Sequence, residues 1–121
     1  MKKILNTLVL ALACLIGFSG CTKKTDEILI GEFGTLTGGE ATFGQSTNKG
    51  LRMALDEINA AGGVKGKKIK LITYDNQGKT DETAAVVTRL ITQDKVVAII
   101  GEVASGRTLV AAPIAQQYKV P

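Results

Sequence analysis

Histidine is absent from the 121 residues of this chain, and its absence narrows the chemistry that the chain can perform. Without an imidazole there is no histidine-based acid–base catalysis and no metal site with a histidine ligand. The common nucleotide fingerprints are missing too. The glycines Gly34, Gly38, Gly39 and Gly44 do not fit G-x-G-x-x-G, and no glycine precedes Lys-Ser or Lys-Thr in the phosphate-loop spacing. The sequence therefore predicts neither an enzyme nor a protein with a cofactor or a bound metal.

A strong excess of positive charge is missing as well. The formal net charge is +4, and Lys2 and Lys3 lie in a segment that we expect to be removed. The other basic residues are dispersed, except in residues 65–70, which alternate as a solvated turn and strand edge would. So small a surplus does not support binding to nucleic acid.

No apolar run is long enough to predict a helix that spans a membrane. Residues 4–18 are mostly apolar but are interrupted by Asn6 and Thr7, and they follow a short positive start. This layout is typical of a secretory signal rather than of a spanning helix. We therefore expect residues 1–20 to be a signal peptide.

Cysteine is scarce, with one residue at position 14 and one at position 21. The run Phe18-Ser19-Gly20-Cys21 resembles the lipobox of bacterial lipoproteins, which implies cleavage before Cys21 and attachment of lipid to its sulfur. The alternative is a stray thiol behind an ordinary signal peptide. Cys14 would leave with the signal, so an internal disulfide is excluded. Residues 21–26 would then be a lipidated tether that holds residues 27–121 on a membrane surface, in the periplasm or on the cell surface.

Hydrophobic patterning predicts strands and helices in alternation. The expected strands cover about 27–33, 69–74 and 96–100, and the expected helices about 44–61, 80–94 and 105–119. This order predicts an α/β fold, in which a parallel sheet carries helices on both faces. We expect Thr42 and Gln45 to form a capping box on the first helix, and Pro113 to kink the third. The pattern calls for more strands than residues 27–121 contain, so we expect an incomplete lobe of a longer protein.

The segment 96–108 is the most informative part of the chain. Its apolar run predicts a strand that is covered on both faces and stops at Gly101, and Ser105 is a strong N-cap type for the next helix. In a parallel sheet, ligands bind at the carboxyl ends of the strands, which lie here at the loops 34–43, 75–79 and 101–105. A serine hydroxyl beside free helix N–H groups suits a carboxylate or a phosphate. The alternative is that Ser105 only caps its own helix.

Acidic residues lie near the ends of the predicted strands, at Glu32, Asp75 and Glu102. A pair of them could serve acid–base chemistry, but nothing in the sequence brings two together. We expect each to be solvated or to cap a neighbouring helix. Residues 75–78 lack the further oxygen ligands of a calcium loop and are expected to form a turn.

The most specific motif of the chain is the run Asp56-Glu57-Ile58-Asn59-Ala60-Ala61-Gly62-Gly63-Val64-Lys65-Gly66. The others lie in order along the chain: Ile28-Leu29-Ile30-Gly31, Leu36-Thr37-Gly38, Phe43-Gly44-Gln45, Tyr74-Asp75-Asn76-Gln77-Gly78, Ile99-Ile100-Gly101 and Ala112-Pro113-Ile114. Together they resemble the type I periplasmic substrate-binding proteins of the leucine/isoleucine/valine class, which serve ABC importers. The resemblance implies a partial N-terminal lobe of a two-lobe fold that closes on a small ligand.

The resemblance also implies which residues bind the ligand. Ser105 stands where the family's serine hydrogen-bonds the α-carboxylate of an amino acid. Val103 and Ala104 stand where backbone groups contribute, and Gly106 belongs to the same helix N-terminus. Phe43 stands where an aromatic residue borders the ligand, although it could instead staple the first helix.

Arg107 has two candidate roles, which are to reach the ligand carboxylate or to cover the helix surface, and we expect the second. The features together predict an extracytoplasmic lipoprotein that binds a branched-chain or similar amino acid and delivers it to an ABC transporter permease. A ligand-sensing domain of the same fold in a receptor or regulator is the alternative.

Overall fold

A computed structural model describes residues 26–121 as strands and helices in strict alternation. The elements are β1 (Ile28–Gly34), α2 (Ala41–Ala60), β2 (Ile69–Asp75), α3 (Thr80–Thr92), β3 (Ala98–Ile100) and α4 (Ser105–Tyr118). The expected signal peptide and the lipobox cysteine Cys21 lie outside the described residues. Within residues 26–121, no helix is long and apolar enough to cross a membrane.

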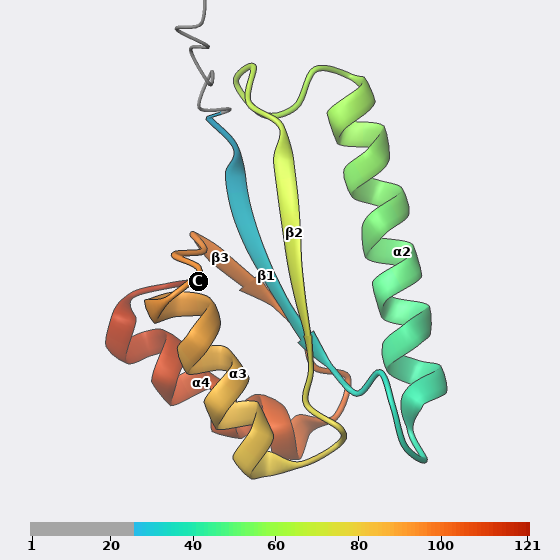
Figure 1. The fold of residues 1–121 in the computed structure, drawn as a ribbon, viewed down its shortest axis with the longest axis vertical. Helices are drawn as coiled ribbons and strands as arrows, with labels where there is room; N and C mark the ends of the chain where they lie inside the picture. Colours follow the sequence, from blue (N-terminus) through green and yellow to red (C-terminus); the bar gives the residue numbers. More distant parts are fainter. Residues whose placement is uncertain (1–25) are drawn as a thin grey trace, which may run out of the picture.

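The three strands form one parallel sheet in the order β2-β1-β3. β1 pairs with β2 from Ile28 opposite Ile69 to Gly34 opposite Asp75, and its other edge pairs with β3. Helix α2 lies on one side of the sheet, and α3 packs with α4 on the other (Figure 1). The predicted α/β fold, with a parallel sheet and helices on both faces, is confirmed.

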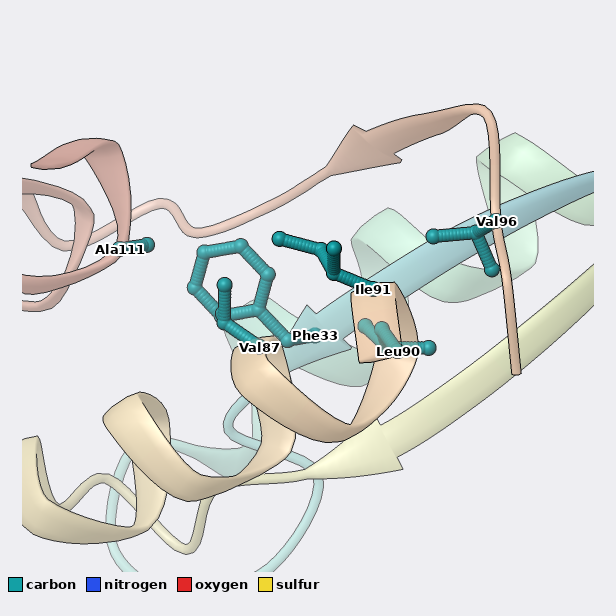
Figure 2. Packing of buried hydrophobic residues seen from close by; sticks show 6 residues of the cluster. All are labelled: Phe33, Val87, Leu90, Ile91, Val96 and Ala111. Carbon is teal, nitrogen blue, oxygen red and sulfur yellow. The ribbon is translucent and has the colours of Figure 1, made fainter. Parts of the chain in front are cut away.

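The central strand β1 presents different side chains to its two faces, because successive residues of a strand point in opposite directions. Gly31 faces α3 so closely that a Cβ atom built on it would lie 3.0 Å from the side chain of Leu90. Phe33, two residues on, is buried on the same side. It belongs to the hydrophobic core shown in Figure 2, with Val87, Leu90, Ile91, Val96 and Ala111. The main core therefore lies between the sheet and the pair α3 and α4.

Helix α2 begins earlier than predicted and without the expected cap. Its first residue is Ala41, and its N-cap residue, Glu40, makes no side-chain capping bond. Gln45 donates a hydrogen bond to the Leu36 carbonyl at 3.0 Å. The predicted capping box of Thr42 and Gln45 is therefore wrong, because Gln45 stabilises the loop after β1 instead.

The later helices agree more closely with the pattern. Helix α3 buries Val87, Leu90 and Ile91 on the side that faces the sheet. Helix α4 continues through Pro113 as one element and ends at Tyr118, where Lys119 has a left-handed backbone with φ 57°.

Strand β3 is shorter and less covered than predicted. It spans Ala98–Ile100, and Val97 and Ile100 are 58% and 39% exposed, while Val96 is buried. The expectation of a strand covered on both faces is wrong for the described residues, in which β3 lies at the edge of the sheet. An apolar groove of about 390 Å³ runs beside it along α4, lined by Phe33, Ile99, Ala111, Ala115, Val120 and Pro121 among others.

Candidate functional site

The loops that follow the three strands meet at one end of the sheet, and Asp75 joins the first two. Its carboxylate accepts hydrogen bonds from the backbone N–H groups of Leu36 at 2.9 Å and Gln77 at 2.8 Å. The Thr37 hydroxyl donates a third, at 2.5 Å. Burial, the largest single influence, raises the pKa of Asp75, but the hydrogen bonds from Thr37, Leu36 and Gln77 outweigh it and hold that pKa below its ordinary value. Asp75 is therefore ionised at neutral pH and, although it is only half-buried, it holds the two loops together.

Glu102 joins the third loop to the other two. Its side chain is 0% exposed, and its carboxylate accepts a hydrogen bond from the Asn76 amide at 2.6 Å. The buried Thr35 hydroxyl lies 3.0 Å from Asn76 Oδ1 and 3.4 Å from Glu102 Oε2. The expectation that Glu102 would be solvated or cap a helix is therefore wrong, since this carboxylate is the centre of a buried polar network.

Arg107 provides the positive charge beside that carboxylate. Its side chain is only 12% exposed, its Nε lies 3.4 Å from Glu102 Oε2, and its Nη1 donates to the Gly78 carbonyl at 3.2 Å. Its Nη2 forms an ion pair with Glu40. The hydrogen bond to Glu40, the largest cause, and the contacts with Glu102 raise the pKa of Arg107 above its ordinary value. The expected surface role of Arg107 is wrong, because the guanidinium lies among the three loops.

Glu32 is buried on the opposite face of the sheet, against α2. It is 2% exposed, and it accepts hydrogen bonds from the Thr73 hydroxyl at 2.7 Å and from the Asn48 amide. This acid is not solvated either. The three strand-end acids share no hydrogen-bond partner among residues 26–121, and the described part of the chain holds no cluster of three or more acids and cysteines that could bind a metal.

Four of the five predicted ligand residues, all but Phe43, lie at or just before the start of α4. Ala104 is the N-cap residue, with an extended backbone, and Ser105 is the first helical residue, so Ser105 is not the cap that we expected. The first backbone bonds of the helix run from the N–H groups of Arg107 and Thr108 to the Ala104 carbonyl, each at 3.1 Å. The N–H groups of Ser105 and Gly106 precede these bonds, and both residues are exposed.

Two of the predicted ligand residues have exposed apolar side chains. Val103 is 58% exposed and Phe43, in the first turn of α2, is 66% exposed. Gly44, the neighbour of Phe43, lines a cavity of about 10 Å³ together with Val103 and Gly34. The structure thus brings the α2 start and the third loop together. So exposed a ring gives no support to the alternative that Phe43 staples α2.

The sequence interpretation missed Thr35 and Asn76, which are both buried. Asn76 also donates to the Thr83 hydroxyl at 3.0 Å, and its own Oδ1 accepts from the Gly78 N–H at 3.0 Å. A signal was present, because each of these polar residues lies two positions after the end of a predicted strand. The expected turn at residues 75–78 is confirmed, and its side chains also tie the loops together.

Residues 27–121 match the family described as periplasmic binding protein. A relative named "Amino acid binding protein" from Pseudomonas aeruginosa is 36% identical over 113 residues, which cover 93% of this chain and 30% of that protein. A "Leu/Ile/Val-binding protein homolog 7" from Brucella suis is 33% identical over 118 residues, which cover 96% of this chain and 28% of that protein.

Solved structures resemble the chain in the same way. The branched-chain amino acid transporter substrate-binding protein LivJ from Streptococcus pneumoniae, in complex with isoleucine, has a TM-score of 0.77 and 43% identity, over 78% of this chain and 27% of that one. The leucine-binding protein LivK from Thermotoga maritima has a TM-score of 0.71 and 36% identity, over 78% and 26% of the two chains. The chain therefore spans less than a third of the length of these relatives. They are named as binding proteins, not as enzymes.

Proposed function

The chain belongs to the periplasmic binding protein family, and on that basis we propose that it forms one wall of an extracytoplasmic binding site for an amino acid, branched-chain or similar. The observation that carries this proposal is the exposed start of α4, where the Ser105 hydroxyl and the first N–H groups lie at the carboxyl end of the sheet. Ligands of open α/β sheets bind at this end. The names of the relatives in the leucine/isoleucine/valine class support the choice of ligand.

The chemistry of the wall suits an amino acid with an aliphatic side chain. The N-terminus of α4 carries partial positive charge, which favours the α-carboxylate, and the Ser105 hydroxyl can donate to the same group. Backbone groups of Val103 and Ala104 and the N–H of Gly106 complete this part of the wall. The exposed side chains of Val103 and Phe43 offer apolar contact to the rest of the ligand. We assign the remaining contacts to other parts of the full-length protein.

We expect Ser105→Ala to weaken binding of L-leucine and L-isoleucine to the full-length protein about tenfold or more, since a hydrogen bond to a charged group contributes roughly 1.5–3 kcal/mol. Isothermal titration calorimetry measures the difference. Ser46→Ala is the matched control, because the Ser46 hydroxyl donates to the Thr42 carbonyl of its own helix, at 2.8 Å. Equal affinities of wild type and Ser105→Ala would remove Ser105 from the site.

We also propose that the protein is tethered by lipid on Cys21 and passes its ligand to an ABC transporter permease. The lipobox-like run before Cys21 supports the tether, and the relatives described as transporter components support the partner. The family description supports a periplasmic location.

The lipid proposal predicts that cells producing the protein incorporate labelled palmitate into it. We expect Cys21→Ser to abolish the label, because the lipid would be attached to that sulfur, and Cys14→Ser to retain it. Gel fluorography of the immunoprecipitated protein gives the result. Label that persists in Cys21→Ser would contradict the tether.

A further inference from the structure

We propose that Arg107 is a positioning residue for Ser105, because it holds the three loops in the arrangement that directs the Ser105 hydroxyl at a ligand carboxylate. The proposal rests on the proposed function and adds to it a residue that does not itself contact the ligand.

One guanidinium connects all three loops. Its Nη2 pairs with Glu40 after β1, its Nη1 donates to the Gly78 carbonyl after β2 at 3.2 Å, and its Nε lies 3.4 Å from Glu102 after β3. The three acceptors are far apart in the sequence. Only a planar fork with several donors can serve them together, which is a property of arginine and not of lysine.

The connection continues from Glu102 to the helix that carries Ser105. The Thr108 hydroxyl, in the first turn of α4, donates to the Glu102 backbone carbonyl at 2.9 Å. The Glu102 carboxylate is fixed from the other side by the Asn76 amide at 2.6 Å. Only Val103 and Ala104 separate Glu102 from Ser105, so the place of the Glu102 backbone sets the place of the helix start.

Arg107 has little capacity left for a ligand of its own. Its side chain is 12% exposed, Nη1 donates to the Gly78 carbonyl, and Nη2 donates to Glu40 and, at 3.5 Å, to Glu102. Nε makes no hydrogen bond among the described residues, but it is buried 3.4 Å from the Glu102 carboxylate, where a ligand does not reach it. Its effect on a ligand therefore passes through the loops and through Ser105.

A double-mutant cycle between Arg107 and Ser105 tests this route. We expect Arg107→Lys, which keeps the charge and loses the fork, to weaken binding of L-leucine and L-isoleucine to the full-length protein about tenfold. In a Ser105→Ala background we expect Arg107→Lys to weaken binding of these amino acids less than about twofold, because the residue through which Arg107 acts has lost its hydroxyl. Calorimetric titration of wild type, the two single variants and the double variant gives the coupling free energy between Arg107 and Ser105.

Arg89→Lys is the matched control, because Arg89 lies on α3 with its guanidinium 4.6 Å from the centre of the Tyr74 ring, and it should bind as wild type does. Glu40→Gln provides a second variant in case Arg107→Lys folds poorly. Glu40 is 59% exposed, so its replacement removes one anchor of the guanidinium without burying an unpaired charge. We expect Glu40→Gln to lower the affinity for the amino acid about threefold, again only when Ser105 is present.

Wild-type affinity in both Arg107→Lys and Glu40→Gln would overturn the positioning role. Equal losses with and without the Ser105 hydroxyl would overturn it too, because they would indicate direct ligand contact or a general loss of structure. A wild-type protein that binds neither amino acid would overturn the proposed function itself. That failure shows in the first titration, before any variant is compared.

Discussion

Replacing Arg107 with methionine is expected to lower the free energy of unfolding by about 3–5 kcal/mol, the effect of removing one partner of a buried ion pair. The Glu102 side chain is 0% exposed, and Arg107 is its only cationic partner among the described residues. Without the guanidinium, the carboxylate keeps only the Asn76 amide and the Thr35 hydroxyl as neutral partners. Urea unfolding followed by circular dichroism measures the change.

The control for this prediction is a second substitution at the partner. In the Arg107→Met background, Glu102→Gln removes the unpaired charge and keeps an oxygen that can accept from Asn76. We expect the double variant to regain most of the lost stability, since replacing both members of a buried pair is often close to neutral. If Arg107→Met alone unfolds at the same urea concentration as wild type, Glu102 does not depend on this cation.

The elements and their topology could be predicted because they depend on local pattern. Apolar residues at helical spacing and short apolar runs identified the three helices and three strands of residues 26–121. Helix-length connections between strands predicted a parallel sheet. Boundaries shifted by a few residues, and the expected helix caps did not form. Gln45 bonds the Leu36 carbonyl rather than a helix terminus, and Ala104, not Ser105, caps α4.

The buried charges could not be predicted, because their partners are far apart along the chain. Arg107 and Glu40 are 67 residues apart, and Asn76 and Glu102 are 26 apart. An acid or arginine near the end of a strand is usually solvated, and only the meeting of three loops at one sheet edge turns these residues into a buried network. The exposure of β3 could not be predicted for a similar reason. Whether a strand is buried depends on the elements that pack beside it, and its own apolar residues do not specify them.

The ligand residues fall between these two cases. The family resemblance assigned Ser105, Val103, Ala104, Gly106 and Phe43 as a group. The structure places four of them at the start of α4 and leaves the Phe43 ring exposed at the start of α2. Their contacts with a ligand are proposals, and the titration of Ser105→Ala tests the one made by the Ser105 hydroxyl.

The second large effect is expected at Gly44, in the first turns of α2. A Cβ atom built on Gly44 would lie 2.0 Å from the carbonyl oxygen of Thr35 and 2.6 Å from its carbonyl carbon. Both contacts are with backbone, so neither can be relieved by a change of side-chain rotamer. Gly44→Ala must push α2 away from the loop after β1, and we expect a loss of about 3 kcal/mol in the free energy of unfolding. The same displacement should weaken amino acid binding, because the Thr35 hydroxyl reaches Glu102 from that loop.

Gly50→Ala separates this close approach from the general effect of alanine in a helix. Gly50 lies on the same helix, is exposed, and has nothing within 4 Å of a built Cβ atom. There alanine removes only the conformational freedom of glycine in the unfolded chain, so we expect Gly50→Ala to stabilise the protein by about 0.5–1 kcal/mol. Two identical substitutions in one helix should thus change stability in opposite directions. Equal changes in the free energy of unfolding for Gly44→Ala and Gly50→Ala would contradict the close contact between Gly44 and the Thr35 backbone.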